Sequence, residues 1–223
     1  MTLLIGTASK NHVVLTADGL SRPNPITGAG KASENVQKIF PHPNSPLAIA
    51  HHGLNILSGR DVQLRIADFF ACVGNEIDTV TLEELGNRLI SQMDESAKET
   101  FKDPTNKGII GFWIAGFGHR QVRPGIFEVC WPSKVELNNL RHLTIGGDGK
   151  RFIRKYLNVP LGRFSPEKTR VEGYSTGFTI AYHDALYRKA DQLQSSAGQK
   201  IFGGHKHQLI IQKSGRVWKR API

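Results

Sequence analysis

The order of apolar segments constrains the fold of this 223-residue chain more than any other feature. Four strand-like runs come first, at 3–8, 13–18, 36–40 and 46–50, and two segments with helical spacing follow, at 62–73 and 82–93. Strand patterns return at 107–118, 125–131 and 140–147, helical patterns at 150–157 and 176–194, and strand patterns at 207–212 and 216–220. This order predicts an α+β fold in which two helical layers enclose two sheets, a four-layer αββα sandwich.

Composition predicts a globular protein with one domain, spanning 1–223. Hydrophobic residues make up 39% of the chain, and no low-complexity linker or internal repeat divides it. No apolar run reaches the ~18 residues of a membrane span, and the first residues lack the pattern of a secretory leader, so we expect a cytoplasmic protein with no membrane partner. The two cysteines, Cys72 and Cys130, are too few for a disulfide scaffold.

The charge is positive and unevenly distributed. The net charge is +10, and residues 121–223 hold 18 of the 29 Lys and Arg residues but only 7 of the 19 Asp and Glu residues. A basic surface of this kind attracts nucleic acid or other anions. The basic side chains are scattered, however, apart from a cluster at 150–155, and no aromatic residues interleave with them. A solvated surface is the simpler interpretation, and we do not expect nucleic acid to be a partner.

The N-terminus offers a candidate nucleophile. A threonine hydroxyl reacts only when a base lies within hydrogen-bond reach, and an N-terminal threonine carries its own base, the α-amine. Removal of Met1 would expose Thr2 in this form. Many unrelated proteins also begin with Met-Thr, so this feature alone is not specific.

Asp18 and Lys38 are the candidate partners of Thr2. If the chain turns at Lys10 and Asn11, antiparallel pairing brings Asp18 beside Thr2 and Leu3. Lys38 precedes an apolar pair in VQKIF, and an ammonium group paired with Asp18 would favour deprotonation of the Thr2 hydroxyl and a neutral α-amine. Taken separately, each is more simply a surface residue at a strand.

Together these residues resemble a known family. The segment TLLIGTASKNHVVLTADG, followed by QKIF, is similar to the start of proteasome β-type subunits, which are N-terminal nucleophile hydrolases. That family begins its mature chain with threonine, places an acid sixteen residues later, and has a lysine before the next apolar pair. Lys38 comes about four residues later than in most members, across a longer turn. An ungapped alignment would place Glu34 there, and Lys31 is another candidate. Lys38 keeps the apolar residues in register.

The resemblance extends over the whole chain and implies further site residues. LAIAHHG resembles the segment whose backbone amide forms the oxyanion hole, which corresponds to His51. IGGDGKRF resembles the glycine-serine-glycine turn that supports the amine, so Gly147 and Asp148 are supporting residues, with aspartate in place of serine. IFGGHKH resembles the loop that usually carries an acid and a hydroxyl near the amine, but neither can be assigned; Ser195, Ser196 and Gln199 are nearby in sequence.

The resemblance implies a threonine endopeptidase in a self-compartmentalising ring, closest to the betaproteobacterial proteasome homologue and Anbu groups. Peptides or unfolded proteins would be substrates, and identical subunits would form a double ring of two heptamers, leaving room for an unfoldase or adaptor. No cofactor is expected. An inactive ring-forming scaffold of the same fold and a basic nucleic-acid-binding protein are the alternatives.

Four histidines are candidate metal ligands, but a metal site is not the favoured interpretation. His205 and His207 share one face of a predicted strand, and His51 and His52 lie in the segment assigned to the oxyanion hole. Carboxylate partners at ligand spacing are missing, so we expect no metal at these imidazoles.

Overall fold

The computed structural model describes residues 2–22, 32–102, 109–119, 121–131, 138–139, 143–156 and 173–222. The strands are β1 (Leu4–Ala8), β2 (His12–Ala17), β3 (Ile39–Pro41), β4 (Leu47–Gly53), β5 (Ile56–Leu57), β6 (Arg60–Asp61), β7 (Ile110–Gly116), β8 (Gly125–Trp131), β9 (Asn138–Asn139), β10 (Leu143–Gly146), β11 (His207–Gln212) and β12 (Gly215–Arg220). The helices are α1 (Val62–Val73), α2 (Leu82–Thr100), α3 (Lys150–Tyr156) and α4 (Thr176–Ser196), with a 3₁₀ helix at Gly74–Asp78.

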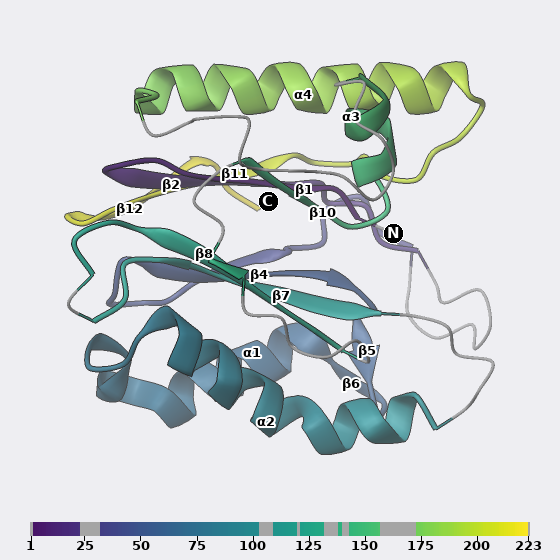
Figure 1. The fold of residues 1–223 in the computed structure, drawn as a ribbon. Coiled ribbons are helices and arrows are strands. Elements are labelled where there is room, and N and C mark those ends of the chain that lie inside the picture. The colour runs from purple at the N-terminus through teal and green to yellow at the C-terminus, as the bar shows by residue number, and fades with distance from the viewer. Residues whose placement is uncertain are drawn as a thin grey trace.

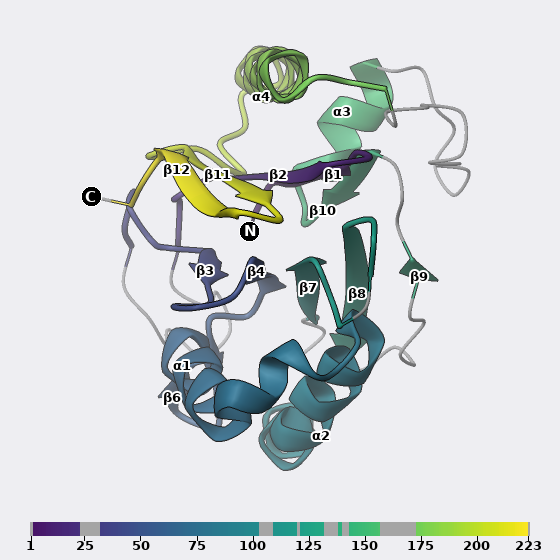
Figure 2. The same ribbon diagram turned by 90° about the vertical axis from the view of Figure 1, so that its left-hand side faces the viewer.

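Two five-stranded antiparallel sheets form the centre of the structure. The first sheet has the order β10-β1-β2-β11-β12, and the second has the order β3-β4-β7-β8-β9. The sheets lie face to face, with α3 and α4 over the outer side of the first and α1 and α2 over the outer side of the second (Figure 1). A view from the side shows the same stacking (Figure 2). The structure therefore confirms the predicted α+β class.

Three apolar clusters explain why the layers stay together. One cluster joins the second sheet to α1 and α2 and includes Phe69, Leu85 and Phe112. Another fills the space between the sheets, and a third joins the first sheet to α3 and α4. Leu4 contributes to the cluster between the sheets and Ile5 to the cluster under the helices, because successive side chains of a strand point to opposite faces. Both faces of β1 are thus buried.

A polar contact also connects α4 to the first sheet. His183 of α4 is fully buried, and its ring nitrogens lie 2.8 Å from Thr7 Oγ1 and 2.9 Å from Thr16 Oγ1. Burial lowers the pKa of His183 to about 3, so the imidazole is neutral. Neighbouring His12 contacts Thr179 of the same helix at 3.1 Å.

The element boundaries agree with most of the predicted segments. The helix predicted to 93 continues to Thr100, and Thr81 caps its N-terminus by accepting a hydrogen bond from the Glu84 amide at 3.1 Å. The small β5–β6 hairpin and the 3₁₀ helix were not predicted. Residues 107–108, 140–142 and 157 of the predicted elements lie outside the described residues.

Candidate active site at the start of β1

Thr2 lies immediately before β1 and is buried, with 2% of its surface exposed. Leu4 pairs with Ala17 on β2 and with Gly146 on β10, so Thr2 enters the sheet between two neighbouring strands. The backbone amide of Gly149 donates a hydrogen bond to the Thr2 carbonyl oxygen at 3.0 Å. The turn after β10 therefore holds the backbone of Thr2. Met1 lies outside the described residues.

Asp18 lies beside the start of β1 because the first hairpin has a short turn. Ser9 N–H donates to His12 O at 2.9 Å across Lys10 and Asn11. At the other end of the hairpin, Leu3 N–H donates to Asp18 Oδ1 at 2.8 Å, and Asp18 N–H donates to Leu3 O at 3.2 Å. The carboxylate is thus one residue from Thr2, as the predicted hairpin required.

Two more backbone amides and one ammonium group complete the surroundings of the Asp18 carboxylate. Its Oδ2 accepts hydrogen bonds from Leu20 N–H at 3.1 Å and Gly203 N–H at 3.2 Å. Lys38 Nζ donates to Oδ1 at 2.9 Å and to the Leu20 carbonyl oxygen at 2.7 Å. The carboxylate is therefore both hydrogen-bonded and paired with a cation, which are the conditions under which a buried charge is tolerated.

Lys38 and Asp18 form a buried ion pair, with exposed side-chain fractions of 1% and 0%. Burial lowers the pKa of Lys38, and the attraction of Asp18 opposes this shift without cancelling it. A lysine with a lowered pKa releases and takes up a proton more readily near neutral pH than an exposed lysine. The pair therefore supplies positive charge and a titratable amine next to the start of β1.

Glu34 and Lys31 were the two alternatives to Lys38 as the residue beside Asp18. Glu34, the residue of the ungapped alignment, is exposed and pairs with Lys200 at 2.8 Å. Its backbone carbonyl accepts a hydrogen bond from His205 N–H at 2.6 Å. Lys31 lies outside the described residues. Among the described residues, the structure brings Lys38 to Asp18.

Gly147 and Asp148 form the turn under Thr2. Gly147 has a φ of +75°, a left-handed conformation, and a Cβ atom built on it would lie 2.2 Å from the Thr2 carbonyl oxygen. Glycine is required here for both reasons. Asp148 is exposed. Its negative charge raises the pKa of Lys38, but by less than the charge of Asp18 does.

His51 does not present a free backbone amide. Its N–H donates to the carbonyl oxygen of Lys38 at 3.0 Å, which continues the pairing of β3 with β4. Its imidazole Nε2 lies 3.0 Å from Asn55 Oδ1, and Asn55 Nδ2 donates to Ser21 Oγ at 2.7 Å. Burial, with a smaller contribution from Lys38, lowers the pKa of His51 to about 3. The amide assigned to the oxyanion hole from the resemblance is therefore already engaged.

The loop after α4 contributes backbone groups to the site. Gly203 donates to Asp18, as described above, and its carbonyl oxygen accepts hydrogen bonds from Gly19 and Leu20 N–H at 3.1 and 2.9 Å. The nearby polar residues that sequence singled out make other contacts: Ser196 Oγ donates to Gln192 O, and Gln199 Oε1 accepts from Arg151. Sequence patterns do not reveal backbone donors, so this role of Gly203 was missed.

The four histidines considered as metal ligands do not form one common site among the described residues, although His52 belongs to a different group of donor atoms. His207 Nε2 lies 3.1 Å from Asn35 Oδ1, and His205 Nε2 lies 3.0 Å from the Ala221 carbonyl oxygen. Within the part of the chain that the structure describes, the one group of three or more metal-binding side chains is His52, Glu128 and Cys130. Cross-strand proximity of 52 and 130 depends on sheet register, which the sequence alone did not provide.

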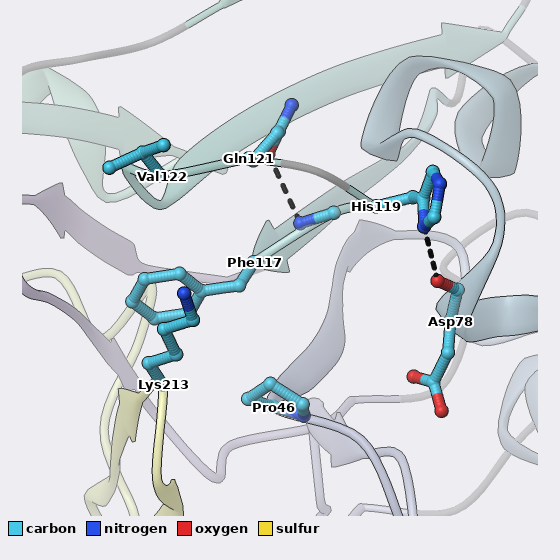
Figure 3. A pocket seen from close by; sticks show the side chains of 8 residues that line it. Pro46, Asp78, Phe117, His119, Gln121, Val122 and Lys213 are labelled. Carbon is cyan, nitrogen blue, oxygen red and sulfur yellow. Dashed lines mark hydrogen bonds between the residues drawn. The ribbon is translucent and has the colours of Figure 1, made fainter.

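A cavity of about 320 Å³ lies near the residues that precede β4 and follow β7, at the end of these strands away from the candidate active site (Figure 3). His119 Nδ1 contacts the Asp78 carbonyl oxygen at 2.7 Å, and Gly118 N–H donates to Gln121 Oε1 at 3.1 Å. The Asp78 carboxylate is already bound by Ser45 Oγ at 2.6 Å. These contacts are within the protein, and the residues of the candidate active site do not line this cavity.

No described helix is both long enough and apolar enough to cross a membrane. Comparison with known proteins leaves the family open: no protein-family model and no curated protein matches the chain.

Proposed function

We propose that the protein is a threonine peptidase with the four-layer fold of proteasome β-type N-terminal nucleophile hydrolases. The observation that carries the proposal is the buried Asp18–Lys38 pair, which lies next to Leu3 and is separated from Thr2 by a single residue. A buried ion pair is costly to desolvate and is not needed to stabilise a core. Its position beside a threonine at the start of a strand gives it a chemical use.

In the proposed reaction, the hydroxyl of Thr2 attacks the peptide carbonyl after the residue before Thr2 has been removed. The free α-amine accepts the hydroxyl proton and donates it to the leaving amine, which leaves the acyl group as an ester on Thr2. Water then attacks this ester with the α-amine as base, the carboxylic acid product leaves, and the proton returns to the Thr2 hydroxyl. Lys38 stabilises the forming alkoxide electrostatically, and Asp18 orients Lys38 through the 2.9 Å hydrogen bond. Gly147 and Gly149 fix the backbone of Thr2, so the nucleophile needs little reorganisation.

The oxyanion donor is reassigned from His51 to Gly53. Alternate amides of a strand point to the same edge, so the N–H of Gly53 follows that of His51 along the edge of β4 that faces β3. The β3–β4 register ends near Lys38, and Gly53 lies two residues beyond this point. Glycine is required at this position because its φ is +98° and a Cβ atom built on it would lie 1.9 Å from the Ile109 carbonyl oxygen. Replacing Gly53 by glycolic acid, which substitutes an ester oxygen for the N–H and adds no side chain, tests the assignment: kcat should fall if this N–H binds the oxyanion and stay unchanged if it does not.

The partners follow from the same proposal. Peptides or unfolded proteins are the substrates, and identical subunits assemble into a double ring of two heptamers that encloses the active sites. Mass measurement of the intact assembly tests the ring stoichiometry independently of activity.

The decisive experiment compares Thr2→Ala with Thr2→Ser in a form of the protein whose chain begins at residue 2. Fluorogenic peptides report turnover, and a peptidyl β-lactone or boronate reports reaction at the nucleophile. We expect Thr2→Ala to abolish both signals and Thr2→Ser to retain covalent labelling, because serine keeps the hydroxyl. Turnover by Thr2→Ala would refute the proposal.

A ring-forming scaffold without turnover is the second candidate, and the engaged amide of His51 favours it. The same labelling experiment separates the two. A chain that begins at residue 2, assembles into rings and fails to react with either probe would support the scaffold.

A further inference from the structure

A second cluster of reactive side chains lies between the sheets, on the second sheet. The register pairs His52 of β4 with Gly111 of β7, and Gly111 with Cys130 of β8. Positions 52, 111 and 130 therefore form one row across three neighbouring strands. Glu128 lies two residues before Cys130 on β8, so its side chain points to the same face as the cysteine.

Gly111 allows the outer two residues of this row to approach each other. A Cβ atom built on Gly111 would lie 2.3 Å from His52 Nε2 and 3.1 Å from Cys130 Sγ. Both distances are shorter than ordinary contacts, so the imidazole and the thiol occupy the space above the middle strand that a side chain would fill. A residue larger than glycine at this position would separate them.

The three donor atoms are close enough for a single ion. They all lie within 4.8 Å of one another, and His52 Nε2 is 3.2 Å from Glu128 Oε1. Trp113 Nε1–H donates to the same oxygen at 3.1 Å, which fixes the carboxylate from the neighbouring strand. The Glu128 side chain is 30% exposed, so an ion can reach the cluster from solvent.

We propose that His52, Glu128 and Cys130 bind a divalent zinc-class cation through one nitrogen, one oxygen and one sulfur. Zinc takes these three ligand types at about 2.0–2.3 Å in tetrahedral geometry, and three protein ligands leave the fourth position for water. A thiolate and a carboxylate balance the two positive charges of the ion, so the occupied site is neutral. Magnesium and calcium prefer oxygen ligands and do not suit this set.

Metal binding requires the Cys130 thiol to lose its proton, and the surroundings of Cys130 disfavour this loss when no metal is bound. Burial raises the pKa of the Cys130 thiol to about 12, and the Glu128 charge adds to this effect. A bound cation reverses this preference by forming the metal–sulfur bond as the thiol proton leaves to solvent. Coordination through Nε2 requires the neutral imidazole with its proton on Nδ1, an atom with no hydrogen-bond partner among the described residues.

The cluster lies close to the turn that holds Thr2. A Cβ atom built on Gly146 would be 3.3 Å from His52 Cδ2, and Gly146 precedes the glycine under Thr2. A cation that cross-links β4 to β8 would therefore stiffen this end of the sandwich. The inference does not depend on the peptidase proposal, because it involves other side chains and a different measurement.

The test is titration of the tag-free, reduced protein, stripped of metal by a chelator, with Co²⁺ followed by Zn²⁺. We expect a thiolate-to-cobalt charge-transfer absorption that saturates at one ion per chain and disappears when Zn²⁺ is added. Cys130→Ser should abolish this absorption. Cys72→Ser is the matched control, because Cys72 is the other cysteine of the chain and lies exposed on α1.

Glu128→Gln should weaken zinc binding by more than about 100-fold, because loss of a residue outside the ligand set already costs 10–100-fold. Zn²⁺ at 100 times its Kd should raise the Tm of the wild-type protein by about 5–10 °C, whereas Mg²⁺ should not. Absence of the charge-transfer band in folded wild-type protein would overturn the inference whatever the variants do. A band that persists in Cys130→Ser would overturn it as well.

Discussion

Replacing Gly147 by alanine tests whether the turn after β10 positions Thr2. The new Cβ atom would lie 2.2 Å from the Thr2 carbonyl oxygen and 3.1 Å from Thr2 Cβ. Ordinary contacts are about 3.5 Å, so Thr2 must move by roughly 1 Å, or the turn must open by the same amount. A displacement of ~1 Å at a reacting group costs on the order of 100-fold in rate.

Gly59→Ala is the matched control. Gly59 has a φ of +72°, close to the +75° of Gly147, but a Cβ atom there meets nothing within 4 Å. Both variants carry the cost of a left-handed alanine, about 1–2 kcal/mol. Only Gly147→Ala adds overpacking, which costs about 1–3 kcal/mol more. Because 1 kcal/mol shifts the Tm of a chain of this size by about 2–4 °C, we expect an additional decrease of about 2–12 °C.

Differential scanning calorimetry measures the stability difference, and peptide turnover by protein whose chain begins at residue 2 measures the displacement of Thr2. Gly59→Ala should keep wild-type turnover. Equal Tm changes in the two variants, together with unchanged turnover in Gly147→Ala, would show that Gly147 does not position Thr2.

Three further predictions concern charge. Lys38→Met leaves the Asp18 carboxylate buried without its cation and should lower the free energy of unfolding by about 3–5 kcal/mol, measured in urea, with partial recovery in Lys38→Met/Asp18→Asn; a loss below about 1 kcal/mol would contradict this. His183 and His51 each have a folded pKa of about 3 against 6.5 unfolded, so the unfolded state binds more protons between these values, and stability should fall as pH decreases. From pH 7 to pH 5 the loss is about 2 kcal/mol for each histidine, and His183→Gln should flatten the measured slope; an unchanged slope would exclude His183 as its source. Asp148→Asn removes a charge that raises the pKa of Lys38, and the proposed mechanism needs Lys38 protonated, so the alkaline limb of kcat/KM should move to lower pH; a shift of this limb to higher pH would refute the role of Asp148.

The first hairpin shows what sequence patterns predict well. Two apolar runs joined by four polar residues determine the pairing, and the pairing determines that Asp18 lies beside Leu3. Local patterns suffice here because strand alternation and a short turn fix the geometry. The proximity of Lys38 to Asp18 was harder to predict, because the sequence between these two residues has no regular strand or helix pattern.

Other features depend on atoms that residue types do not identify. The His51 amide donates to Lys38, although any residue at 51 would have an amide. Gly203 contributes only its backbone N–H to Asp18. The row of His52, Gly111 and Cys130 depends on the register of three strands, which distant packing sets. Such features can be identified only from the three-dimensional structure.

The Asp18 carboxylate has a consequence for the order in which the site assembles. Its partners come from the start of the chain, from residues 20 and 38, and from Gly203, which is 185 residues away. During synthesis the early partners emerge long before Gly203, and such distant contacts form late because a long loop must first close. If Thr2 is the nucleophile as proposed, the carboxylate beside it gains its last hydrogen bond only after residue 203 has been made. Under the proposed function, a growing chain would lack the Gly203 hydrogen bond to the Asp18 carboxylate until this late step.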